Sequence, residues 1–372
     1  MMPFLQNALL LIASIALSTG VEASNHVKKG SKGKARHTRK AEAPTPTGTP
    51  YGRRADVMQM AQDIALRRNL DPAWVSQTLA QAQAIPVIAR LMLPPPSGTP
   101  KNWRVYRSRF VEPVRIAAGV RFWQAQRDWL QRAEQAYGVP AEIIVGIIGV
   151  ETIYGQQMGT YRVIDALATL AFDFPKAHPR AEARQAFFMG ELEQYLSLAS
   201  RRDADPLQAR GSYAGAMGMP QFMPSSWAKY AVDFDGDGKV DLFNSPADVI
   251  GSVASYFQAF NWQPGMPTHY PVRFDPARLD LDALLAPDIL PTFSVASMAA
   301  KGALVEPRPE DPDKAPAGTL ALVELQNGNE PAQYVAGTEN FYAITRYNWS
   351  NYYAMAVIEL GQAVAKQMGE RR

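Results

Sequence analysis

One glutamate stands in a sequence environment suited to acid chemistry. Glu151 ends an apolar run, residues 143–150, in which every side chain is aliphatic or absent. Such a run is apolar on every face of a helix, so we expect a buried helix that begins near Pro140 and ends near Gly155. Burial disfavours the charged form of a carboxyl group and raises its pKa. A glutamic acid still protonated near neutral pH can donate a proton to a glycosidic oxygen. The alternative is a carboxylate that caps a buried hydrogen-bond network.

An aspartate-rich segment, residues 233–241, follows the calcium loop of an EF-hand. Oxygen-bearing side chains stand at loop positions 1, 3, 5 and 9, and Gly238 stands at position 6. Position 12, normally a glutamate, is Asn244, so we expect Asp248 to supply the missing carboxylate. The expected ligands are the side chains of Asp233, Asp235, Asp237 and Asp248 and the main-chain carbonyl of Lys239. A single loop predicts one structural Ca²⁺ rather than a sensor; an Asp-Gly turn with solvated carboxylates is the alternative.

Two further segments combine polar groups with small or aromatic residues. Residues 211–227 are rich in glycine and alanine and contain Ser212 and Gln221, which could hydrogen-bond a sugar whose chain approaches the backbone closely. Residues 342–353 concentrate tyrosines, a tryptophan, an arginine and asparagines, a composition that suits stacking on sugar rings. A tight loop between helices and a corner with tyrosines in the core are the structural alternatives.

These segments together resemble the lytic murein transglycosylase B family (glycoside hydrolase family 103). The resemblance rests on Gly-Val-Glu-Thr-x-Tyr-Gly at 149–155, Ala-Gly-Ala-Met-Gly-x-x-Gln-Phe-Met-Pro-Ser-Ser at 214–226, the calcium loop, and Arg-Tyr-Asn at 346–348, in that order. It covers the chain from about residue 55 to the end. It implies a mainly α-helical, lysozyme-like catalytic core with an accessory helical domain, one EF-hand-like loop and a small β subdomain.

The resemblance also implies a reaction, cleavage of the β-1,4 bond between MurNAc and GlcNAc of peptidoglycan to give a 1,6-anhydro-MurNAc end. Glu151 matches the single acid/base, so no organic cofactor is expected. The positions that match groove-lining residues are Tyr106, Ser212, Gln221, Tyr256, Tyr347, Asn348 and Tyr353. Arg184 is the best candidate for a substrate-binding arginine, although residues 174–184 are longer than the corresponding family segment. A hydrolytic muramidase on the same scaffold and a non-catalytic peptidoglycan-binding protein remain alternatives.

The elements that must position these residues are mostly helical. Residues 55–264 are predicted to hold the accessory helices and the catalytic core, including the calcium loop 233–248 and one helix over about 113–137. Asn327-Gly328 between apolar runs predicts a hairpin in a β-rich subdomain over 265–345. Residues 346–372 are predicted to return to the core, with a last helix over 351–366.

The N-terminus predicts export. Residues 1–23 read as a signal peptide with a small-residue cleavage site, and residues 24–54 as a flexible basic, proline-rich linker. The chain has 372 residues, a net charge of +3 and no cysteine, which excludes disulfides, thiolate chemistry and a lipid anchor on an N-terminal cysteine. We therefore expect a soluble, monomeric periplasmic form that binds peptidoglycan glycan strands and no nucleic acid. Wall-synthesis or remodelling proteins are possible further partners.

Overall fold

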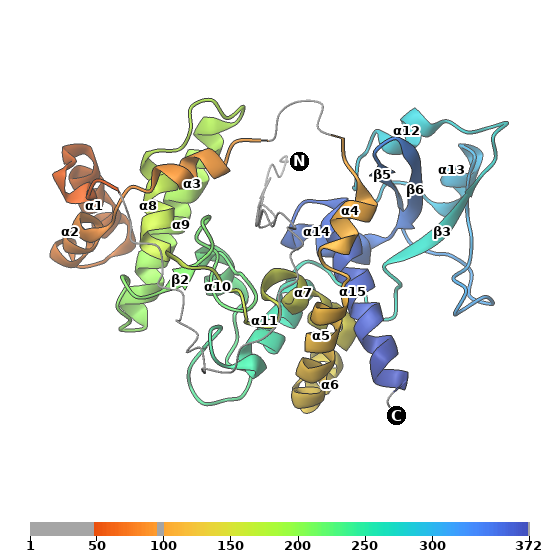
Figure 1. Ribbon diagram of the computed structural model, residues 1–372, viewed down its shortest axis with the longest axis horizontal. Coiled ribbons are helices and arrows are strands. Elements are labelled where there is room, and N and C mark those ends of the chain that lie inside the picture. Colours follow the sequence, from red (N-terminus) through yellow and green to blue (C-terminus); the bar gives the residue numbers. More distant parts are fainter. Residues whose placement is uncertain (1–47, 95–99, 371–372) are drawn as a thin grey trace, which may run out of the picture.

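The structure is a computed structural model that describes residues 48–94 and 100–370. Within these ranges the chain forms fifteen α-helices and six strands, and none of the described helices has the length and apolarity to cross a membrane. Helices occupy one end and the centre of an elongated molecule, and the main sheet lies at the other end (Figure 1). The predicted signal peptide and the predicted linker up to residue 47 lie outside the described residues.

The end of the predicted linker is folded. Residues 48–54 contain the 3₁₀ turn η1 (Tyr51–Arg53), in which Tyr51 is 1% exposed and donates its hydroxyl to Asp173 Oδ2 at 2.6 Å. The Tyr51 side chain, its hydrogen bond to Asp173, and backbone hydrogen bonds from Tyr51 N–H to the Ala82 carbonyl at 3.0 Å and from Ala84 N–H to the Thr49 carbonyl at 3.2 Å attach this segment to the helices. Residues 48–54, predicted as linker, therefore belong to the folded region.

The helices in chain order are α1 (Ala55–Arg68), α2 (Pro72–Gln81), α3 (Pro86–Leu91), α4 (Trp103–Ser108), α5 (Pro113–Ala125), α6 (Arg127–Tyr137), α7 (Ala141–Thr152), α8 (Val163–Phe172), α9 (Ala181–Arg201), α10 (Pro224–Tyr230), α11 (Pro246–Ala259), α12 (Leu281–Leu285), α13 (Val295–Ala300), α14 (Glu339–Tyr347) and α15 (Asn351–Glu370).

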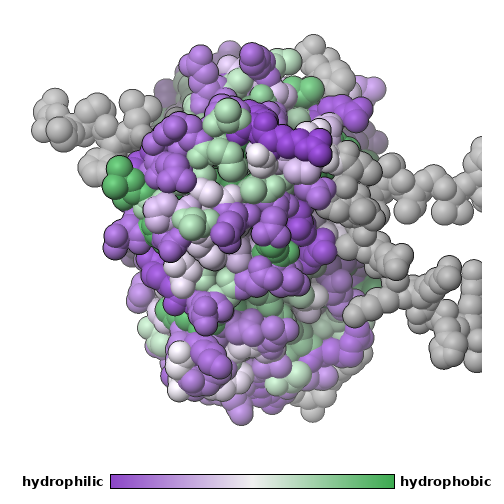
Figure 2. Space-filling view, turned by 90° about the vertical axis from the view of Figure 1, so that its left-hand side faces the viewer, coloured by the Kyte–Doolittle hydropathy of each residue, from purple (hydrophilic) through white to green (hydrophobic). Residues whose placement is uncertain are grey.

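Helices α1 and α2 form the end of the molecule that faces the viewer in Figure 2, where the surface is mainly hydrophilic with scattered apolar residues.

The single helix predicted over 113–137 is two helices. Gln126 leaves the helical conformation, with φ −115° and ψ 21°, and separates α5 from α6. The break lets the two halves pack on different partners, since α5 lies against α15 while α6 lies against α11. Tertiary packing therefore overrides a continuous helical pattern here.

The apolar helix α7 lies at the centre of the main core. It packs against α15, α5, α6 and α11, and all its residues except Glu142 are buried. Two glycines set its distance from α15: a Cβ on Gly146 would come within 2.3 Å of the Val357 carbonyl oxygen, and one on Gly361 within 2.1 Å of the Glu142 carbonyl oxygen. Glycine weakens a helix interior relative to alanine, so its presence in α7 reflects this close approach.

The β-rich subdomain contains one antiparallel sheet in the order β4-β3-β6-β5. Its strands are β3 (His269–Phe274), β4 (Ala303–Val305), β5 (Ala321–Asn327) and β6 (Glu330–Gly337); the short strands β1 (Tyr161–Arg162) and β2 (Arg210–Gly211) pair elsewhere. The structure contains the predicted hairpin, with Gly328 at φ +67° between β5 and β6.

Both faces of β5 are covered. Leu322 packs into a small core of the subdomain, whereas Val323 and Leu325 belong to the main core. The predicted boundary at residue 345 is too late, because the sheet ends at Gly337 and α14 already packs in the main core through Phe341.

Candidate active site

Glu151 lies in the last turn of α7 and is 8% exposed. Tyr353 Oη, on α15, donates a hydrogen bond to Glu151 Oε1 at 2.5 Å. Burial raises the pKa of Glu151 to about 7, while the Tyr353 hydrogen bond and the positive charge of Arg115 act in the opposite direction. The carboxyl group can therefore both donate and accept a proton near neutral pH.

Arg115 is a neighbour of Glu151 that the sequence did not reveal. It extends from α5 and donates its Nη1 to the carbonyl oxygens of Gly149 at 2.8 Å and Val150 at 3.2 Å. These two residues immediately precede the glutamate. Arg115 is separated from Glu151 by more than one helix in the sequence, so no local spacing pattern could have paired them.

The turn after Glu151 differs from the prediction. The helix ends at Thr152 rather than near Gly155, and two residues that are not glycine, Ile153 and Tyr154, take left-handed φ values of +51° and +56°. Left-handed isoleucine is rare because its branched side chain crowds the backbone. Thr152 Oγ1 stabilises the turn by donating to the Met219 carbonyl at 2.8 Å and accepting from the Gly155 N–H at 3.0 Å. Strained turns of this kind cluster at functional sites.

Three of the four tyrosines expected in the groove are buried, namely Tyr256, Tyr347 and Tyr353. The Tyr347 hydroxyl donates to the Pro220 carbonyl at 2.5 Å, and the Tyr256 hydroxyl donates to the Arg346 carbonyl at 2.6 Å. The Tyr347 ring also stacks on that of Tyr353, with centroids 6.5 Å apart. These contacts join α11 to α14, and α14 to the loop before α10 and to Tyr353 on α15.

The glycine-rich loop is held by its own polar side chains. Ser212 Oγ accepts the N–H groups of Ala214 and Ala216 at 3.3 and 3.0 Å. Gln221 has φ +52°, is 6% exposed and donates Nε2 to the carbonyls of Gly218 at 2.9 Å and Met158 at 3.2 Å. Both residues therefore shape the loop, and these contacts occupy the Gln221 amide N–H group.

The remaining expected binding residues lie in three places. Asn348 directly follows α14 and is 8% exposed. Tyr106 belongs to an aromatic cluster with Trp103, Phe110 and Tyr352, the last being adjacent to Tyr353 in the chain. Arg184 lies on α9 and is 7% exposed, with its guanidinium 5.5 Å from the centre of the Phe188 ring. Burial and the positive charge of Arg180 lower the pKa of Arg184, and Tyr213 opposes this shift, so the arginine lies close to the loop that contains Ser212.

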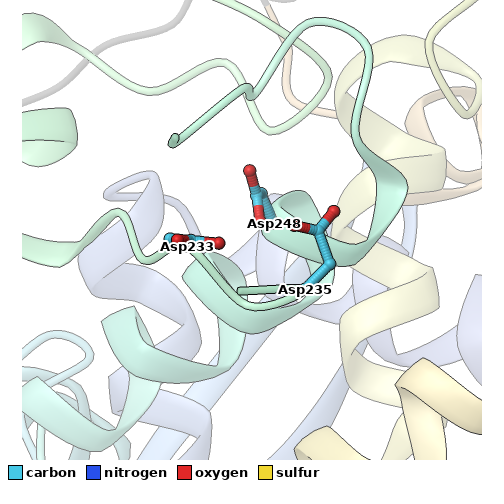
Figure 3. Close-up of side chains that lie close together, drawn as sticks. All are labelled: Asp233, Asp235 and Asp248. Atoms are coloured by element: carbon cyan, nitrogen blue, oxygen red, sulfur yellow. The ribbon is translucent and has the colours of Figure 1, made fainter. Parts of the chain in front are cut away.

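Three carboxylates of the predicted calcium loop converge. Oxygens of Asp233, Asp235 and Asp248 all lie within 4.8 Å of one another (Figure 3). Backbone N–H groups orient them: Asp233 Oδ2 accepts from Gly238 at 2.8 Å, and Asp248 Oδ1 accepts from Phe234 at 2.8 Å. Oxygen donors of this kind suit a hard cation such as Ca²⁺, so the residues present fit the expected ion. Asp248 lies outside the twelve-residue loop, and its carboxylate converges with those of Asp233 and Asp235.

Two other aspartates of the loop make local hydrogen bonds. Asp237 Oδ1 accepts the Lys239 N–H at 2.8 Å, and Asp237 is not among the three converging carboxylates. Asp241, expected at loop position 9, accepts the N–H groups of Phe243 at 2.9 Å and Asn244 at 3.0 Å. Asp241 therefore caps the turn that leads to α11, a role that the spacing pattern could not distinguish from metal binding.

Comparisons with known proteins agree with this geometry. A family profile described as the transglycosylase SLT domain matches residues 52–362. The membrane-bound lytic murein transglycosylase B of Escherichia coli (strain K12) is 41% identical over 87% of this chain and 91% of its own length. The chain belongs to the lytic murein transglycosylase B family. The expectation of an enzyme of the lytic transglycosylase type is thereby confirmed.

Solved structures of this family share the fold. The Escherichia coli lytic transglycosylase SLT35, determined in complexes with bulgecin A and with calcium, is 40% identical, covers 87% of this chain and 97% of its own, and superposes with a TM-score of 0.73. SltB3 from Pseudomonas aeruginosa, in complex with NAG-NAM-pentapeptide, is 29% identical over 83% of this chain and 79% of its own, with a TM-score of 0.68. The expected mainly α-helical, lysozyme-like fold is confirmed.

Proposed function

We propose that this protein cleaves the β-1,4 bond between MurNAc and GlcNAc of peptidoglycan and leaves a 1,6-anhydro-MurNAc end, with Glu151 as its single acid/base. The main support is that Glu151 is buried with a pKa of about 7 and that no second carboxylate of the described residues perturbs it. Glycosidases with two catalytic carboxylates hold them within reach of the same bond. A single carboxyl group with a pKa near neutrality instead suits a mechanism in which one residue first donates a proton and then accepts one.

The proposed reaction has two proton transfers. Glu151 first donates its proton to the oxygen that leaves with GlcNAc, and the C1–O bond of MurNAc breaks. The N-acetyl group of MurNAc stabilises the positive charge that develops at C1. The Glu151 carboxylate then accepts the proton of the C6 hydroxyl while the C6 oxygen bonds to C1 and closes the anhydro ring. Atoms balance without water, and the apolar setting of α7 favours this outcome by excluding water.

The other site residues are assigned around this centre. Tyr353 positions the Glu151 carboxyl group through its 2.5 Å hydrogen bond. The glycan-binding groove is proposed to be lined by Ser212, Gln221, Asn348, Tyr106 and Arg184. The buried hydroxyl groups of Tyr347 and Tyr256 are proposed to hold the wall of this groove in place. The pentapeptide-bearing ligand of SltB3 supports a glycan strand as substrate.

We also propose one structural Ca²⁺ held by Asp233, Asp235 and Asp248, with Asp237 and the Lys239 carbonyl completing the set. The convergence of three carboxylates and the calcium complex of SLT35 support this assignment. The predicted signal peptide supports a periplasmic location. No organic cofactor is required by the proposed reaction.

The test compares the wild type with Glu151→Gln on purified cell-wall sacculi. The substitution keeps the side-chain shape and removes the acid, and general acid catalysis typically contributes about 10²- to 10⁴-fold, so release of soluble muropeptides should fall by at least about 10²-fold. Release at the wild-type rate would refute the assignment of Glu151.

Mass spectrometry of the products separates the alternatives. Anhydro ends are lighter by one water than the reducing ends that a hydrolytic muramidase on the same scaffold would leave. Binding of sacculi by the wild type without any soluble product would instead indicate a peptidoglycan-binding protein.

A further inference from the structure

We propose that Arg115 is a positioning residue that fixes the last turn of α7 and places a buried positive charge beside Glu151. The inference rests on the proposed role of Glu151 as acid/base. In this proposal α5, through Arg115, helps to determine the pH at which Glu151 loses its proton.

The hydrogen bonds of Arg115 provide the first argument. Its Nη1 donates to the carbonyl oxygens of Gly149 and Val150, at 2.8 and 3.2 Å. The Gly149 carbonyl also accepts the Ile153 N–H at 3.2 Å, whereas the last carbonyls of a helix generally lack partners within the helix. A cation at this end is favourable for the helix dipole. Arg115 therefore anchors the backbone from which the Glu151 side chain projects.

The setting of the guanidinium provides the second argument. The Nε of Arg115 is buried and has no hydrogen-bond partner among the described residues, and the guanidinium lies 5.1 Å from the centre of the Phe110 ring. Burial lowers the pKa of Arg115, and the negative charge of Glu112 opposes that shift. A buried cation with an unsatisfied donor is a poor contributor to stability, which favours a role in the site.

Tyr154 holds α5 against the turn that follows Glu151. Its hydroxyl fits between two glycines: a Cβ on Gly119 of α5 would come within 2.4 Å of it, and one on Gly149 of α7 within 2.5 Å. The Tyr154 ring also stacks on Phe122 of α5, with centroids 5.1 Å apart. This close fit fixes α5 relative to the end of α7, and with it the position of Arg115.

The other titratable groups around Glu151 are tyrosines, which are neutral near pH 7, and Glu112, which lies beside Arg115. Tyr353 on α15 and Tyr347 on α14 interact with Glu151, burial raises the pKa of both tyrosines, and Tyr154 follows on the same turn. Glu112 lies beside Arg115. No titratable group of α6 or α11, within the described residues, perturbs Glu151. Arg115 is thus the one cation in the described structure whose charge acts on this carboxyl group.

The test is the pH dependence of kcat/KM on soluble, uncrosslinked peptidoglycan strands, whose alkaline limb reports the essential acid of the free enzyme. Arg115→Gln keeps an amide donor for the helix carbonyls and removes the charge. It should move the alkaline limb upward by about 1 pH unit, the lower end of the effect of a nearby opposite charge. Arg115→Lys keeps the charge and should restore the wild-type limb. Arg121→Gln, the same change at an exposed position of α5, should leave the limb in place.

An alkaline limb of Arg115→Gln that coincides with the wild type overturns the inference, even if the rate or the melting temperature falls at every pH. Should Arg115→Gln not fold, Arg115→Met gives the same test, because methionine keeps an unbranched stem beside Phe110 and carries no charge. Its alkaline limb should also move upward, and an unmoved limb overturns the inference equally. Glu151→Gln measured in parallel separates the two claims. If it is active, the proposed function fails; if it is inactive while the limbs do not move, only the role of Arg115 fails.

Discussion

Replacing Glu151 with glutamine should stabilise the folded protein at neutral pH while it removes activity. The buried carboxyl group has a pKa raised from 4.5 to about 7 by desolvation. In the unfolded chain the same group loses its proton near pH 4.5. Between these two values the folded state therefore binds more protons than the unfolded state, and the stability of the wild type falls as the pH rises.

The size of this effect follows from the pKa difference. One pKa unit corresponds to about 1.4 kcal/mol, so a rise from 4.5 to about 7 makes the wild type about 3 kcal/mol less stable above pH 7 than at pH 4. Glutamine does not ionise and can still accept the Tyr353 hydrogen bond. The free energy of unfolding of Glu151→Gln minus that of the wild type should therefore increase by about 3 kcal/mol as the pH rises from about 4 to above 7. At higher pH this difference should stay constant.

Urea unfolding of both proteins, at closely spaced pH values from about 4 to 8, measures this difference directly. The control is Gln131→Ala on α6, an exposed position where neither side chain ionises, so its difference from the wild type should not vary with pH. A pH-independent difference for Glu151→Gln as well would show that the folded state does not favour the protonated carboxyl group. The reasoning that makes Glu151 a general acid would then be wrong.

Three further predictions address the supporting contacts. Tyr353→Phe removes the hydrogen bond that lowers the pKa of Glu151, so the alkaline limb of the pH–rate profile should rise by about 1 pH unit; an unchanged limb would contradict this role. Gly361→Ala places a Cβ within 2.1 Å of the Glu142 carbonyl oxygen and should destabilise the protein by about 1–3 kcal/mol in urea unfolding. Gly190→Ala on α9, where no atom lies within 4 Å of the added Cβ, should not lower stability. Chelation of Ca²⁺ should lower the melting temperature more than the activity per folded molecule, with about 2.7 kcal/mol of stabilisation when the ion is present at a hundred times its Kd. Asp248→Asn should reduce this response, and Asp241→Asn should retain it; equal melting curves with and without chelator would exclude a structural ion.

The parts of the structure that the sequence predicted are those with strong local patterns. The apolar run before Glu151 is a buried helix, since no face of it could be solvated. Asn327-Gly328 forms the hairpin because this pair accepts the left-handed backbone of a tight turn. The spacing of the aspartates located the loop, and Asp248 lies with Asp233 and Asp235.

The parts that the sequence could not predict depend on contacts between distant segments. Arg115 reaches Glu151 only because α5 and α7 pack together. The break at Gln126 reflects the different partners of α5 and α6, and Asp241 carries the same side chain as the converging aspartates but turns toward the start of α11. In each case the residue type permits several roles, and tertiary packing selects one.

The proposed double role of Glu151 requires a balance that no single element provides. A group that first donates and then accepts a proton works best with a pKa close to the working pH. Burial by α7 alone would hold the proton too tightly for the second step. The hydrogen bond from Tyr353 on α15 and the charge of Arg115 on α5 favour the carboxylate and bring its pKa back to about 7. The close packing of α7 between these two helices, which depends on Gly146, Gly149 and their contacts, is therefore part of the chemistry as well as of the core.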